Sequence, residues 1–204
     1  MHLPDPRDVF AEMAWEFVAV VGAVDPAKLD GPGLGEWDLR SLIGHTWQGL
    51  VNAQTFLDCP ADRVEIESAV DYFRTALESP SLHSDVAARG RQSGLELGDD
   101  PAEMVRSTAE RVVAVVQAAP LDSVVMVGGL GGMRLGDYLP TRVVELVVHS
   151  DDISRASGQS WSPPPEALEM TLRLLTPMVS GQAGVTVARA LLGRGSVDDI
   201  NVFG

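Results

Sequence analysis

Apolar residues recur along most of the chain at intervals of three or four, the spacing that places them on one face of an α-helix. Four segments are long enough to form the helices of a bundle: residues 5–24, 38–57, 100–119 and 137–157. Asp38 is a favourable N-cap for the second segment, and Gly158 is a natural terminator for the last. The pattern therefore predicts an all-α fold built on a four-helix bundle.

The remaining segments give weaker signals. Residues 67–79 predict a short helix, whereas the polar stretch 81–100 is typical of a loop. Residues 123–135 form an apolar run that four glycines interrupt, which fits either a hairpin or a flexible loop. Two shorter helical patterns follow near the C-terminus. We therefore predict a bundle over residues 1–160 and a helical C-terminal extension over residues 161–204 that packs on it.

Charge and cysteine content narrow the class of protein. The chain of 204 residues carries 29 acidic and 15 basic side chains, a formal net charge of −14, which argues against nucleic acid or an anionic membrane as a partner. The single cysteine, Cys59, excludes an intrachain disulfide and a cysteine-rich zinc site. Neither a secretory signal pattern nor a long uncharged apolar run is present. We therefore expect a cytoplasmic protein that does not span a membrane.

In the stretch VVELVVHSDD at residues 143–152, Glu145 and His149 lie among five apolar residues. Glu145 and His149 are four residues apart, so they project from one helix face about one turn apart. Burial of a carboxylate is costly unless a partner or a metal ion compensates its charge. A Glu/His pair at this spacing arises about 0.5 times by chance in a chain of this composition, so the pair alone is weak evidence.

A third side chain of suitable type lies in the segment 38–57. His45 falls within the apolar stripe of this segment, so it should point inward. His45, Glu145 and His149 together offer three ligands for Zn²⁺, Ni²⁺ or Fe²⁺, with a fourth position left for an exchangeable molecule. In the alternative interpretation, His45 is a hydrogen-bonded core residue and Arg142 neutralises Glu145 as an ion pair.

Two further residues extend the same face of the segment 137–157. Asp152 lies one turn beyond His149 and could orient its ring from outside the ligand set. Arg142 could bind an anionic substrate if it does not pair with Glu145. The chain has no GxSxG motif, and its only cysteine lies in a predicted loop, so we do not expect nucleophilic catalysis by a protein side chain.

Two motifs resemble a known family. WDLRSLIGH at residues 37–45, followed far downstream by ELVVHSDD at residues 145–152, is similar to the metal-binding domain of mycothiol-dependent maleylpyruvate isomerase, in the DinB superfamily of four-helix bundles. The shared pattern is a Trp before the first His, and then E-x-x-x-H-x-x-D. The resemblance spans roughly residues 5–158. It implies zinc as the metal, with ligands and a supporting carboxylate at His45, Glu145, His149 and Asp152.

The resemblance also implies a function. Members of the family use a low-molecular-weight thiol such as mycothiol with a small electrophilic substrate, which makes this chain a thiol transferase or isomerase whose metal stabilises the thiolate. Two alternatives stay open: a non-catalytic metal-binding or stress-response bundle, dimeric through its C-terminal helices, and a metal-dependent hydrolase that activates water. The isomerase has a mixed α/β domain after its bundle, whereas residues 161–204 here have a helical pattern.

Overall fold

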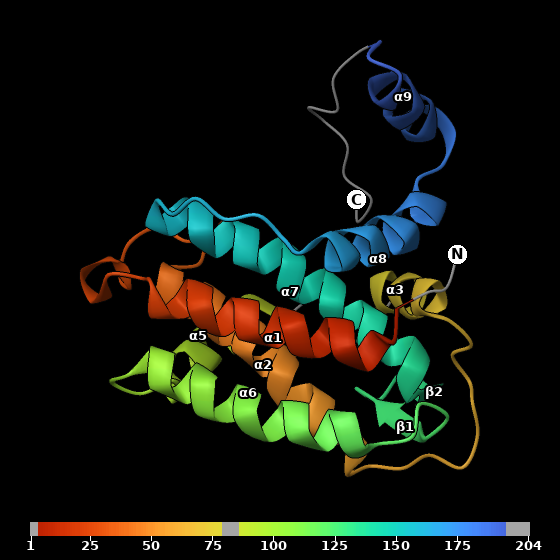
Figure 1. Ribbon diagram of the computed structural model, residues 1–204, viewed down its shortest axis with the longest axis horizontal. Helices are drawn as coiled ribbons and strands as arrows, with labels where there is room; N and C mark the ends of the chain where they lie inside the picture. The colour runs from red at the N-terminus through yellow and green to blue at the C-terminus, as the bar shows by residue number, and fades with distance from the viewer. Residues whose placement is uncertain (1–3, 79–85, 195–204) are drawn as a thin grey trace.

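The computed structural model describes residues 4–78 and 86–194 and places four long helices side by side (Figure 1). These helices are α1 (Pro6–Gly22), α2 (Leu39–Leu57), α6 (Pro101–Ala118) and α7 (Leu135–Ser157). Both α1 and α2 pack against α6 and α7. The prediction of an all-α fold built on a four-helix bundle is confirmed.

Local capping interactions set the ends of the helices that carry the site. The Asp38 carboxylate accepts a hydrogen bond from the Ser41 backbone N–H at 2.7 Å, which satisfies one of the free donors at the start of α2. At the end of α7, Gly158 adopts a left-handed φ of 76° that suits glycine, and Lys28 Nζ donates to the Ser157 carbonyl at 2.5 Å. The sequence therefore predicted both of these boundaries correctly.

One apolar core fills the space between the long helices. Its largest fully buried side chains include Phe10, Met13 and Phe17 of α1, Leu39, Leu42, Ile43 and Leu50 of α2, and Leu135, Tyr138 and Leu139 of α7. Full burial of one such side chain contributes about 1.5–3 kcal/mol. This packing fixes the inner face of α2 relative to that of α7, which is where the candidate site lies.

Two short helices pack on the outside of the bundle: α3 (Ala69–Leu77) contacts α7, and α5 (Val86–Glu96) contacts α2. The prediction of a helix was right for α3, but the prediction of a loop was wrong for the segment that forms α5. The reason is that α5 approaches α2 through glycines and has few apolar side chains. A Cβ on Gly90 would overlap the Trp37 ring, and one on Gly94 would press on the Ser41 backbone.

The glycine-rich run before α7 forms a hairpin. Strand β1 (Val124–Val127) pairs antiparallel with β2 (Gly131–Arg134). Gly128 and Gly129 in the turn have φ values of 54° and 75°, a conformation that glycine adopts without strain. Of the two structures that the sequence allowed, a hairpin or a flexible loop, the segment therefore forms the hairpin. Two turns of 3-10 helix complete the described chain, η1 at Pro26–Lys28 and η2 at Thr176–Met178.

Two helices follow the bundle. Helix α8 (Pro165–Leu175) packs on α7, whereas α9 (Gly181–Leu191) has no buried residue and lies away from the bundle (Figure 1). Residues 81–85 of the predicted loop and residues 195–204 of the predicted extension lie outside the described residues. The division into a bundle and a packed extension stays a prediction. Among the described helices, none is both long and apolar enough to cross a bilayer.

Candidate metal centre

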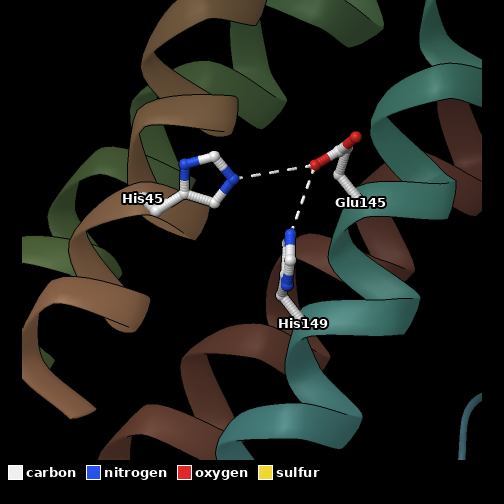
Figure 2. A group of neighbouring side chains, drawn as sticks. All are labelled: His45, Glu145 and His149. Atoms are coloured by element: carbon white, nitrogen blue, oxygen red, sulfur yellow. Dashed lines mark ion pairs between the residues drawn. The ribbon is translucent and has the colours of Figure 1, made fainter. Parts of the chain in front are cut away.

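Three metal-ligand side chains meet between α2 and α7 (Figure 2). His45 Nε2 lies 4.0 Å from Glu145 Oε2, and His149 Nε2 lies 3.4 Å from the same oxygen. One ligand atom from each residue lies within 4.8 Å of the other two. Within residues 4–78 and 86–194, no other group of three His, Cys, Asp or Glu side chains converges in this way.

Aromatic packing restrains the imidazole of His45. The Trp37 ring lies against it with a centroid separation of 4.7 Å and a tilt of 32°, and the His149 ring meets it edge-on at 5.0 Å. Trp37 is itself held by a hydrogen bond from Nε1 to the Ala87 carbonyl of α5 at 3.1 Å. The tryptophan of the WDLRSLIGH motif therefore contacts the candidate site. Its position in the sequence, before the start of α2, does not by itself predict this contact.

The three side chains fit a divalent metal ion. Two imidazole nitrogens and one carboxylate oxygen form a donor set found in catalytic zinc sites, and ligands of a tetrahedral zinc ion lie about 3.4 Å apart. The distance between His149 Nε2 and Glu145 Oε2 already has this value, and the distance of 4.0 Å between His45 Nε2 and the same oxygen is somewhat longer. The side chains of His45, Glu145 and His149 are 28%, 29% and 14% exposed, so a small molecule can reach them.

The protonation of the three groups differs. Burial and the positive charge of His149 lower the pKa of His45 to about 4, so His45 is neutral and able to coordinate at pH 7. Burial also disfavours the charged form of His149, but contacts with Asp152 and Glu145 outweigh it and raise the pKa of His149 to about 9. At pH 7 a metal ion must therefore displace a proton from His149.

Glu145 is held in its charged form. Burial opposes ionisation, but the contact with His149 and the nearby charge of Arg142 outweigh this cost and lower the pKa of Glu145 to about 2. The carboxylate is therefore ready to bind a cation at any pH near neutrality. In the metal-free protein, the proton on His149 supplies a positive charge that compensates the partly buried carboxylate.

Asp152 supports His149 from the far side of the ring. Its Oδ2 lies 3.1 Å from His149 Nδ1, while Nε2 of the same ring faces Glu145. A carboxylate on one ring nitrogen fixes the orientation of the imidazole and makes the other nitrogen a better ligand. The structure thus places Asp152 beside the cluster of three and not within it.

Arg142 lies on the same face of α7 but does not contact Glu145. The residue is 7% exposed, and its guanidinium donates hydrogen bonds to the hydroxyl groups of Thr141 at 3.1 Å and of Tyr72 at 3.2 Å. No ion pair joins Arg142 to Glu145 within the described residues. The structure therefore does not show the ion pair that the alternative interpretation requires. The sequence did not identify Tyr72 as a partner of Arg142, because no local pattern of residues shows how α3 packs on α7.

The sequence was also compared with known proteins. The family model described as the mycothiol maleylpyruvate isomerase N-terminal domain matches residues 10–154. The matched range includes His45, Glu145, His149 and Asp152. The comparison with curated proteins and the comparison with solved structures gave no match.

Proposed function

Because the chain belongs to the family of the mycothiol maleylpyruvate isomerase N-terminal domain, we propose that it is a metal-dependent enzyme that uses a low-molecular-weight thiol. His45, Glu145 and His149 hold the metal ion, for which zinc suits the donor set, and mycothiol is the thiol that the family suggests. The reaction is the transfer of the thiol to a small electrophile, or an isomerisation that begins with its addition. The observation that carries the proposal is the convergence of the three side chains within 4.8 Å.

Each residue has a part in this proposal. When bound, a divalent cation favours the thiolate form of a thiol, which amounts to only a few per cent of a free thiol near pH 7. Glu145 and the two histidines provide two neutral ligands and one negative charge once His149 has lost its proton. Asp152 keeps His149 turned toward the cluster. No protein base is required, because the thiol proton can leave to solvent.

The openness of the cluster favours an exchangeable ligand over a purely structural metal. Structural zinc sites are closed by four protein ligands, whereas three candidate ligands gather here among the described residues. The side chains of His45 and Glu145 are each more than a quarter exposed. A thiol approaching from solvent can therefore reach the same space that the three side chains face.

Elemental analysis of purified protein tests the metal site. We expect about one zinc per chain in the wild type and none in His149→Ala, because two remaining ligands bind zinc weakly. The matched control is Val148→Ala, which changes an adjacent residue of α7 that is 40% exposed and should keep the full metal content. Equal metal content in wild type and His149→Ala would refute the site.

Thiol binding is tested separately on protein substituted with Co²⁺. Titration with mycothiol should produce an absorption band from thiolate-to-cobalt charge transfer, and His149→Ala should show no such band. Full metal content without a band at saturating thiol would exclude thiol activation and favour the non-catalytic bundle. Activity that needs the metal but no added thiol would instead indicate a hydrolase.

A further inference from the structure

Helix α9 carries apolar side chains that the described part of the chain leaves uncovered. The helix buries none of its residues, and Val185 and Leu191 are at least half exposed, as is Leu192 directly after it. Its polar side chains recur at intervals of three or four and therefore share one narrow face: Gln182, Thr186 and Arg189. The rest of the helix surface is apolar.

A helix of this kind is not stable when it is isolated in water. α9 has 11 residues, among them two glycines and three β-branched residues, which have low helix propensity. Isolated helices shorter than about 12–15 residues are marginal even when they are rich in alanine, and most helices in proteins are stabilised by the packing of an apolar face. We therefore expect a second surface to cover the apolar side of α9.

The chain offers an apolar groove of matching length. The groove lies along α8 and η2, has a volume of about 650 Å³, and exposes Leu168 and Leu172 one turn apart. Glu169 and Arg173 at its edge form an ion pair with an N–O distance of 2.6 Å, so they compensate each other. Because α8 also has 11 residues, a helix as long as α9 can lie along the whole of it.

A second copy of the chain fits both surfaces. α9 lies apart from α8 of its own chain (Figure 1), and only Val179 and Ser180 separate it from η2, whose Pro177 lines the groove. Two copies related by a two-fold axis can exchange their α9 helices. Each α9 then covers the groove of the other copy, the two contacts are identical, and the assembly closes at two chains.

The distribution of charge favours a protein surface over an anionic membrane. The chain has a formal net charge of −14, which an anionic membrane repels. The residues from 181 to 194 run against this trend, because they include Arg189 and Arg194 and no acidic side chain. The exposed Glu166 follows the groove residue Pro165. A cationic α9 is therefore complementary to the acidic surface of another copy.

We propose that the chain forms a homodimer in which α9 of each copy packs in the groove along α8 and η2 of the other copy. Both helices lie beyond residue 154, where the match to the family model ends, so the contact uses the C-terminal extension. The dimer depends neither on the metal ion nor on the thiol reaction, and it goes beyond the proposed function.

Sedimentation velocity of the full chain tests the dimer. We expect twice the mass of one chain at micromolar concentration, with or without a chelator. Leu172→Glu in the groove and Leu191→Glu in α9 should each weaken the dimer about 100-fold or more, because burial of one leucine is worth about tenfold and each change affects both contacts. The matched control is Leu95→Glu, which alters an exposed leucine of α5 and should leave the mass unchanged.

A mixture of the two variants tests the exchange of helices. The Leu191→Glu chain keeps an intact groove, and the Leu172→Glu chain keeps an intact α9, so an equimolar mixture restores one of the two contacts. The mixture should therefore contain more dimer than either variant alone. A mixture that stays as monomeric as its components would overturn the proposal.

Crosslinking separates a second copy from the chain's own groove. In a Cys59→Ser background, Leu172→Cys and Leu191→Cys place one thiol on each surface, and a bismaleimide should join two chains into a covalent dimer. A crosslink within one chain would show that α9 folds back on its own α8, which overturns the proposal. A monomeric wild type would do the same, and so would a dimer that either glutamate variant leaves intact.

Discussion

His149 has a carboxylate near each ring nitrogen, Asp152 on one side and Glu145 on the other. In the proposed function, this arrangement would allow His149 to hold a proton in the metal-free protein and to bind the metal ion in place of that proton. Both states need an imidazole in a fixed orientation, and both gain from nearby negative charge. Asp152 provides both without occupying a ligand position.

We predict that Asp152→Ala lowers the affinity for zinc about 10- to 100-fold without abolishing binding, because the orientation of His149 is lost while all three ligands remain. Competition with a chromophoric chelator measures this affinity. Asp151→Ala is the matched control, since Asp151 is the neighbouring carboxylate and pairs with Arg155 at 2.7 Å instead of with a ligand. Equal effects of the two substitutions would show that only net charge matters.

The position of α5 on α2 affects the candidate site. Gly44, directly before His45, lies against the backbone of Ser93 and Gly94 in α5. The same helix supplies the Ala87 carbonyl that holds Trp37 against His45. Close contact between α2 and α5 therefore helps to hold His45 and Trp37 in place.

We expect Gly44→Ala to lower the free energy of unfolding by about 1–3 kcal/mol, because the added methyl group overlaps the α5 backbone and forces the helices apart. Urea denaturation of metal-free protein measures the change. Gly22→Ala is the control within α1, where an added Cβ meets nothing within 4 Å. The close packing would be disproved if both variants were as stable as the wild type.

The apolar core and the candidate metal site are largely separate parts of the molecule. The fully buried side chains of α1, α2 and α7 hold the bundle together, whereas the three candidate ligands are partly exposed. The fold should therefore survive metal removal. The cytoplasmic location, the absence of a nucleic-acid partner and the homodimer stay predictions, and so does the division at residue 160.

Chelation of the metal should lower Tm by roughly 5–10 °C while the far-ultraviolet circular dichroism at 25 °C stays helical. A ligand present at 100 times its Kd stabilises the folded state by about 2.7 kcal/mol, which gives a shift of this size in a chain of this length. Thermal unfolding with and without chelator measures it, and His149→Ala should show no chelator effect. Loss of helical signal on chelation would indicate a structural metal instead.

Features that depend on neighbours along the chain could be predicted from the amino-acid pattern. The apolar spacing gave the long helices, Asp38 and Gly158 gave two of their ends, and the separation of Glu145 from His149 placed them on one face. These features are local because helix hydrogen bonds and caps join residues only a few positions apart. The motif around His45 also indicated the family that the comparison found.

Features that depend on contacts between distant segments became visible only in the folded protein. The packing of α2 on α7 places His45 next to Glu145. Helix α5, in a segment whose sequence predicts a loop, packs closely on α2 through its glycines. The packing of α3 on α7 gave Arg142 a tyrosine partner in place of Glu145. Each depends on how apolar and glycine surfaces of separate helices fit together, and the spacing within any one helix does not encode that fit.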